Sequence, residues 1–111
     1  MKLLSRPEEF LLLAVWRLQG NAYGVTIREQ LKEITGQQWA FGALFVTLDR
    51  LVKKELLDSY TTNPTPQRGG RSKRMYKLTP DGKKALLEVK KVEQAMWADI
   101  PELSLGNLIV S

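Results

Sequence analysis

The chain has 111 residues, of which 43% are hydrophobic, so it is long enough to form one domain with a hydrophobic core. No run of about 18 apolar residues predicts a membrane span, and the lack of cysteine and histidine excludes disulfides, thiolate metal sites and the commonest general base. The formal net charge is +5, and residues 63–77 account for all of it because they hold five basic residues and no acidic one. A basic patch focused on one segment favours a polyanionic partner, most often nucleic acid.

The segment SRPEEFLLLAVWRL predicts a first helix that begins at Ser5. Ser5 and Glu8 have the spacing of a capping box, and Pro7 lies in the first turn, where its missing N–H costs little. A basic start followed by apolar residues can imitate a signal peptide, but Arg6, Glu8 and Glu9 interrupt it and no small-residue cleavage site follows. We therefore expect a helix here, and a cytoplasmic protein.

A second helix is predicted within YGVTIREQLKEITG. Ile27, Leu31 and Ile34 lie four and three residues apart, which places them on one helical stripe. Gly36 is a suitable residue to end this helix because glycine adopts the left-handed conformation without a steric penalty. Trp16 in the first helix and Trp39 after the second are expected to be core residues.

A third helix is predicted from about residue 42 to residue 54, with a buried stripe of leucines at 44, 48 and 51. The opposite face is expected to hold small or basic side chains, which would let it lie close to another molecule. These residues are Ala43, Val46, Thr47, Arg50 and Lys54. An ordinary amphipathic helix whose outer face meets only water would show the same pattern.

Two strands are predicted next, from LLDSYT and SKRMYKLT. The long loop between them contains two prolines and the pair Gly69 and Gly70, which allow a close approach of the backbone to a partner. Arg68 and Arg71 lie in this loop, and Lys73 and Arg74 begin the second strand. A hairpin with a long basic tip, directly after the third helix of a compact trio, is typical of a wing.

The last predicted helix begins with Thr79 as its cap and Pro80 in its first turn, although Pro-Asp-Gly is also typical of a plain turn. An apolar seam then recurs at intervals of four, three and four residues, as in a heptad repeat. The seam consists of Ala85, Val89, Val92 and Met96. Little core is left for this helix to cover, which favours dimerisation through it. The alternative is that it folds back on its own domain.

The order of these elements predicts a winged helix-turn-helix: a mainly α fold with a two-stranded β wing, followed by a C-terminal dimerisation helix. We expect residues 1–79 to form the DNA-binding domain, residues 80–98 the dimerisation helix, and residues 99–111 a tail that we do not assign. A duplex major groove admits one helix, so the third helix would enter it while the arginines of the wing neutralise neighbouring phosphates and release counterions.

Four stretches of the chain resemble the PadR-like transcriptional regulators, in particular the small type with a single C-terminal dimerisation helix. They are YGVTIREQL, FGALFVTLDRL, RGGRSKRMYKLTPDG and the helix that follows, and together the resemblance covers roughly residues 8–97. The resemblance implies a homodimer that binds a palindromic operator in double-stranded DNA and acts mostly as a repressor, without a cofactor or a metal.

Carried over by position, the resemblance also implies which residues contact DNA. On the third helix these are Ala43, Phe45, Val46, Thr47 and Arg50, and on the wing they are Arg68, Gly69, Gly70, Arg71, Lys73 and Arg74. Tyr23 and Gly24 open the helix that braces the DNA backbone.

Two residues depart from the family pattern. Phe45 lies where the family usually has tyrosine, so a hydroxyl that could donate to phosphate is missing. Glu55 lies where the family usually has glycine after the third helix, which removes an easy left-handed stop and adds a negative charge. Neither change breaks the predicted fold, but both affect the expected affinity for DNA.

Trp97 falls near the end of the predicted dimerisation helix. In some small PadR-like regulators the two C-terminal helices enclose an aromatic-lined cavity that binds flat hydrophobic compounds. Two Trp97 side chains across a two-fold axis would form such a site by stacking. The alternative is that Trp97 is part of plain interface packing.

An enzyme is not expected, because the acidic residues are scattered on helix surfaces beside lysines and arginines, and because no phosphate-binding glycine motif lies at a strand-to-helix turn. A winged helix that serves as a protein-binding adaptor is the main alternative, since fold alone does not fix function. Binding to an anionic membrane surface would need apolar anchors beside the wing charges, and Met75 and Tyr76 are expected to pack within the strand.

Overall fold

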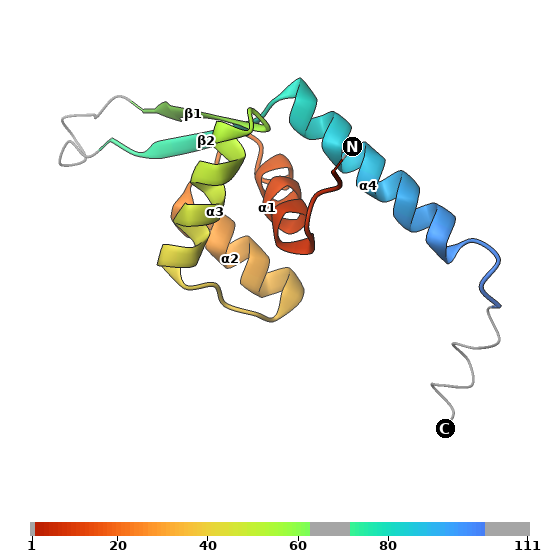
Figure 1. Cartoon of the computed structure of the whole chain (residues 1–111). Helices are drawn as coiled ribbons and strands as arrows, with labels where there is room; N and C mark the ends of the chain where they lie inside the picture. The colour runs from red at the N-terminus through yellow and green to blue at the C-terminus, as the bar shows by residue number, and fades with distance from the viewer. Residues whose placement is uncertain (1, 63–71, 102–111) are drawn as a thin grey trace.

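A computed structural model describes residues 2–62 and 72–101 of the chain (Figure 1). These residues form four helices and one two-stranded antiparallel sheet. In chain order the elements are α1 (Arg6–Arg17), α2 (Gly24–Thr35), α3 (Phe41–Lys53), β1 (Leu57–Thr61), β2 (Arg74–Leu78) and α4 (Pro80–Trp97). The predicted winged helix-turn-helix is therefore confirmed.

The helix ends follow from local sequence signals. Ser5 and Glu8 form the predicted capping box at the start of α1, because the Ser5 backbone N–H donates to the Glu8 carboxylate at 3.0 Å and the Glu8 N–H donates to Ser5 Oγ at 3.3 Å. Gly36 ends α2 with a φ of 77°. Thr79 caps α4 by accepting the Gly82 N–H at 2.9 Å, so Pro80 starts a helix and not a plain turn.

The core lies among α1, α2, α3 and the inner face of the sheet. The three leucines predicted for the buried stripe of α3 are fully buried, as are Ile27 and the pair Leu11 and Leu12. Trp16 and Trp39 are partly buried and pack against this core, as expected. Ile34 is an exception to the predicted stripe of α2, because it lies in the last turn of the helix and is 57% exposed.

The wing is anchored on the helical core. β1 pairs with β2 from Leu57 opposite Leu78 to Thr61 opposite Arg74. β2 is also held on its other side, because the Tyr76 N–H donates to the carbonyl of Ala22 at 2.8 Å in the connection between α1 and α2. This bond fixes the position of the wing relative to the start of α2.

The first half of α4 packs on α1 and β2, whereas its second half extends away from the domain (Figure 1). Leu86 and Val89 are buried against the domain. Arg6 of α1 bridges the two helices, with its guanidinium 3.2 Å from the Glu9 carboxylate and 2.8 Å from that of Glu93. In the described ranges, no helix combines the length and the apolar character needed to cross a membrane.

Candidate nucleic-acid interface

The outer face of α3 differs from the predicted one at one position. Thr47 is only 9% exposed, and its hydroxyl donates to the Ala43 carbonyl at 3.0 Å, so its placement on the outer face was wrong. Lys54 is exposed, as predicted, but its ammonium forms a 2.8 Å ion pair with the buried carboxylate of Glu8. The residues that α3 does expose are Phe41, Gly42, Ala43, Phe45, Val46, Asp49, Arg50 and Lys53.

Aromatic side chains gather at the start of α3. Phe41 and Phe45, one turn apart, stack with ring centroids 6.1 Å apart and planes within 18° of each other. The guanidinium of Arg28 on α2 covers the Phe41 ring at 4.1 Å, and its Nε donates to the Trp39 carbonyl at 2.6 Å. Neither Arg28 nor Phe41 was predicted as a site residue, although the i, i+4 spacing of Phe41 and Phe45 on the predicted helix is a signal that could have indicated the stack.

Gly24 has a packing role in this cluster. It is buried at the start of α2, and a Cβ built on it would lie 2.7 Å from Cζ of the Phe45 ring. Because a side chain at this position would push the ring aside, the absence of one lets Phe45 lie against α2. Gly24 does open α2, as predicted, but it is buried there, so any effect on a partner would act through Phe45.

Tyr23 and Lys73 are far apart in the sequence but lie side by side in the fold. The Lys73 ammonium lies 4.3 Å from the centre of the Tyr23 ring, which gives a cation–π contact between the base of the wing and the start of α2. Tyr23 also forms an isolated β-bridge with Met75. The wing base and the start of α2 thus form one continuous surface.

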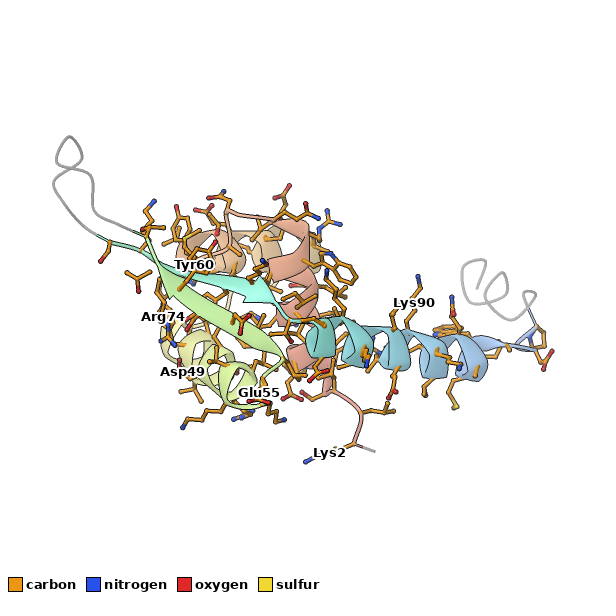
Figure 2. The ribbon with its side chains drawn as sticks, turned by 90° about the horizontal axis from the view of Figure 1, so that it is seen from above. Lys2, Asp49, Glu55, Tyr60, Arg74 and Lys90 are labelled. Atoms are coloured by element: carbon orange, nitrogen blue, oxygen red, sulfur yellow. The ribbon has the colours of Figure 1, made fainter. Side chains whose placement is uncertain are left out.

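Arg74 is tied to α3 by an ion pair. Its Nη1 lies 3.1 Å from the Asp49 carboxylate (Figure 2). Its Nη2 donates a long hydrogen bond of 3.4 Å to Ser59 Oγ. The same guanidinium covers the Tyr76 ring at 5.4 Å. The role of Arg74 as a wing contact stays a prediction, and the ion pair with Asp49 means that its charge is partly neutralised within the chain.

The hydroxyl of Tyr76 lies buried beneath this pair and, among the described residues, has no hydrogen-bond partner. Burial raises the pKa of Tyr76, and the nearby Asp49 adds to the rise while Arg74 opposes it. The phenol therefore stays protonated and neutral at physiological pH.

Four cations, all exposed except the half-buried Arg28, flank the aromatic cluster on several elements. Arg50 and Lys53 follow it along α3, Arg28 lies beside it on α2, and Lys73 lies at the wing base. The predicted wing-tip contacts at Arg68, Gly69, Gly70 and Arg71 lie outside the described residues. Within residues 2–62 and 72–101, no group of three or more acidic side chains could hold a metal ion.

The predicted seam of α4 divides into two parts. Val89 is 5% exposed and Ala85 is half-buried, so these two residues pack within their own subunit and the alternative of folding back holds for this half. Val92, Met96 and Trp97 are 41%, 74% and 61% exposed on the projecting half. This half therefore presents an apolar surface that another molecule could cover.

Comparison with known proteins places this geometry among transcription regulators. The model of the transcriptional regulator PadR-like family matches residues 12–88. No curated protein matches the chain in sequence.

Several solved structures match most of the chain. A PadR family transcription regulator from Clostridium difficile is 30% identical, with a TM-score of 0.61 over 93% of this chain and 98% of that one. A PadR-like transcription factor from Bacteroides fragilis is 27% identical, with a TM-score of 0.67 over 81% and 82% of the two chains. RosR of H. salinarum, at 22% identity, shares the fold with a TM-score of 0.65 over 96% and 90%.

Proposed function

The chain belongs to the PadR-like family of transcriptional regulators, and from this premise we propose that it is a homodimeric repressor that binds a palindromic operator. The observation that carries the proposal is the single surface formed by α3, the start of α2 and the base of the wing. Arg28, Arg50, Lys53 and Lys73 surround this surface with positive charge. A focused positive surface beside an exposed helix suits the phosphates and the major groove of duplex DNA.

In the proposed complex, α3 enters the major groove and the wing follows the neighbouring backbone. Arg50 is the candidate for a bidentate contact to guanine, since it is exposed on the last turn of α3, beyond the apolar residues of the first half. Lys73 would neutralise phosphate from the wing base, together with Arg68 and Arg71 and the Gly69–Gly70 backbone at the tip. Arg74 would act as a positioning residue, because its ion pair with Asp49 ties β2 to α3.

The projecting half of α4 is the proposed dimer contact. Val92 and Met96 continue the apolar seam beyond the point where α1 covers it, so a second copy would bury them. A two-fold dimer places two copies of α3 on the same face of DNA, about one helical turn or a multiple of it apart. This symmetry is the reason for proposing a palindromic operator.

A small hydrophobic effector is proposed for the same end of α4. Trp97 is 61% exposed and Met96 is 74% exposed, and both offer surfaces that favour flat aromatic compounds. Titration with a planar hydrophobic dye tests the site. Quenching of tryptophan fluorescence that is lost in Trp97→Leu, where Trp16 and Trp39 remain, would support it, and equal quenching in both proteins would contradict it.

A protein-binding adaptor is the second candidate, and the exposed rings of Phe41 and Phe45 favour it. These rings are 41% and 40% exposed, and exposed aromatic residues are common in protein interfaces. The cations around them favour DNA. The two candidates differ in one observable, which is the salt-dependent binding of duplex DNA.

The proposal is tested with single variants on a selected operator and on a scrambled duplex. Arg50→Ala is expected to weaken operator binding by roughly tenfold or more and to leave scrambled DNA nearly unchanged. Lys73→Ala is expected to weaken both by similar factors and to reduce the salt slope by about 1 per subunit. Lys90→Ala is the matched control, because Figure 2 shows Lys90 on α4, far from α3 and the strands.

Equal losses on both duplexes for Arg50→Ala would contradict its role in base recognition. No measurable binding of either duplex by the folded wild-type protein at low salt would contradict DNA binding itself and favour the adaptor.

A further inference from the structure

The first half of α3 exposes no side chain that can form a hydrogen bond. Between Phe41 and Val46 every residue is exposed except Leu44, and none of the six carries a polar side-chain atom. The polar residues exposed on α3 begin only at Asp49, which is held by Arg74. Hydrogen bonds to bases from α3 must therefore come from its second half, which leaves the first half without a function in hydrogen-bonded recognition.

The exposed apolar side chains on this half are large and well placed. Val46 is 59% exposed and Phe45 is 40% exposed. The Phe45 ring contacts the Phe41 ring and the surface of Gly24, which has no Cβ, and the Arg28 guanidinium lies 4.1 Å from the centre of the Phe41 ring. This stack limits the motion of Phe45, so its exposed edge is presented in one orientation.

Only one feature of the base edges in the major groove suits such side chains. The groove presents donors and acceptors from all four bases, but its apolar group is the C5 methyl of thymine, which alanine, threonine methyl groups and phenylalanine contact. In helix-turn-helix proteins the first residues of the recognition helix are the ones that meet base edges.

We propose that Phe45 and Val46 contact the C5 methyl groups of thymines in each operator half-site. This inference rests on the proposed function. It divides α3 into a first half that recognises thymine by shape and apolar contact and a second half that recognises bases through Arg50. The surrounding cations, Arg28, Arg50 and Lys53, favour a DNA occupant of this surface over an apolar protein.

The test removes methyl groups from the DNA one at a time. An operator is first selected from random duplexes with the full-length protein. Each thymine is then replaced by deoxyuridine, which lacks the C5 methyl and retains the same hydrogen-bonding groups. At one or two thymines per half-site we expect affinity to fall about fourfold per methyl, the factor that corresponds to ~0.8 kcal/mol for burying one such group.

Two variants identify the protein side of the contact. In Val46→Ala the penalty for deoxyuridine at the matching position is expected to fall from about fourfold to nearly one, because the methyl group no longer has its partner. Phe45→Ala should do the same at a neighbouring thymine, but it also disturbs the stack, so Val46→Ala is the decisive variant. Ile34→Ala is the matched control, since Ile34 is 57% exposed at the far end of α2 and should retain the full penalty.

Three outcomes are distinguishable. Position-specific penalties that disappear in Val46→Ala or Phe45→Ala support the inference. Tight operator binding that is indifferent to every thymine-to-deoxyuridine replacement, or penalties that persist unchanged in both variants, overturns it while leaving the proposed function standing. Failure to select any duplex overturns the inference together with the proposed function.

Discussion

Glu55 has a left-handed backbone, with a φ of 61°, immediately after α3. Its N–H donates to the Val52 carbonyl, and the next N–H, of Leu56, donates to the Leu51 carbonyl, which together form a Schellman motif. Glycine adopts this conformation without the clash between Cβ and the backbone. Glu55→Gly is therefore expected to raise the free energy of unfolding by about 1 kcal/mol, as measured by urea denaturation.

Glu55→Ala separates the effect of charge from that of conformation. Alanine removes the carboxylate but keeps the Cβ, so we expect little stabilisation from it. The Thr79 hydroxyl donates to the Glu55 backbone carbonyl at 2.7 Å, and that bond survives in both variants. Equal stabilisation by alanine and glycine would show that the charge, and not the left-handed backbone, is the costly feature.

Glu8 links the N-terminal cap of α1 to the end of α3. Burial alone would raise the pKa of Glu8, but hydrogen bonds from Lys54 and from the Ser5 backbone and hydroxyl outweigh burial and lower it. A lowered pKa in the folded state stabilises the protein above the ordinary pKa of glutamate, about 4.3, and this contribution is lost as the pH falls through the folded-state value. Glu8→Gln should therefore cost about 1 kcal/mol at pH 7 and progressively less below pH 4.

Glu9 provides the opposite case on the same helix. Burial raises the pKa of Glu9, and the neighbouring carboxylate of Glu93 raises it further, against the effect of Arg6. The contribution of Glu9 to the free energy of unfolding is therefore present below the ordinary pKa of glutamate and is lost as the pH rises through the folded-state pKa. Urea denaturation of Glu8→Gln and of the wild type from pH 3 to pH 7 tests the assignment for Glu8, and a cost of Glu8→Gln that stays constant over this range would contradict it.

At the scale of elements, the junction of β2 and α4 depends on Gly82. A Cβ at this position would overlap the Leu56 carbonyl oxygen, which belongs to the backbone and cannot move aside. Gly82→Ala is expected to destabilise the protein by about 2–3 kcal/mol, although alanine favours a helix more than glycine does.

Gly42 is the matched control for this prediction. It also lies in a helix, and a Cβ there would meet nothing within 4 Å. Gly42→Ala should therefore stabilise α3 by about 0.5–1 kcal/mol. Thermal unfolding of both variants tests the pair, and a stable Gly82→Ala protein would contradict the close packing of α4 against the end of α3.

The sequence was sufficient to predict the elements because their signals are local. The capping box at Ser5, the left-handed stop at Gly36 and the leucine stripe of α3 each depend on residues a few positions apart. The binding surface was predicted less well. The pairing of Arg74 with Asp49, and of Lys54 with Glu8, depends on how distant elements pack, which helical periodicity does not determine.

At the scale of the whole molecule, the second half of α4 projects from the domain (Figure 1). Its exposed side chains include the apolar Val92, Met96 and Trp97. Met96→Glu places a charge on the seam at its most exposed position, so we expect dimers to dissociate at concentrations at least about tenfold higher than for the wild type. Gln94→Glu adds the same charge on the opposite side of α4 and serves as the control. Sedimentation equilibrium measures both, and unchanged association of Met96→Glu would place the dimer contact elsewhere.

The division of α4 into a packed half and a projecting half was beyond a sequence-based prediction. The heptad spacing is continuous from Ala85 to Met96, and nothing in it marks the point beyond which α1 no longer covers α4. That point is set by where α1 begins, at Arg6, whose guanidinium contacts Glu93 of α4. The same spacing therefore serves the core of one subunit at Val89 and an exposed surface at Val92.

The most direct test of the central claim is sedimentation velocity of the pure protein, alone and with a mixed pool of short duplexes at about 50 and 200 mM salt. A DNA-binding regulator should sediment as a dimer and shift in the presence of duplexes, with affinity at least about a hundredfold weaker at the higher salt. A dimer that ignores DNA at 50 mM salt would contradict the account. It would assign the exposed rings of α3 and the cations around them to a protein partner.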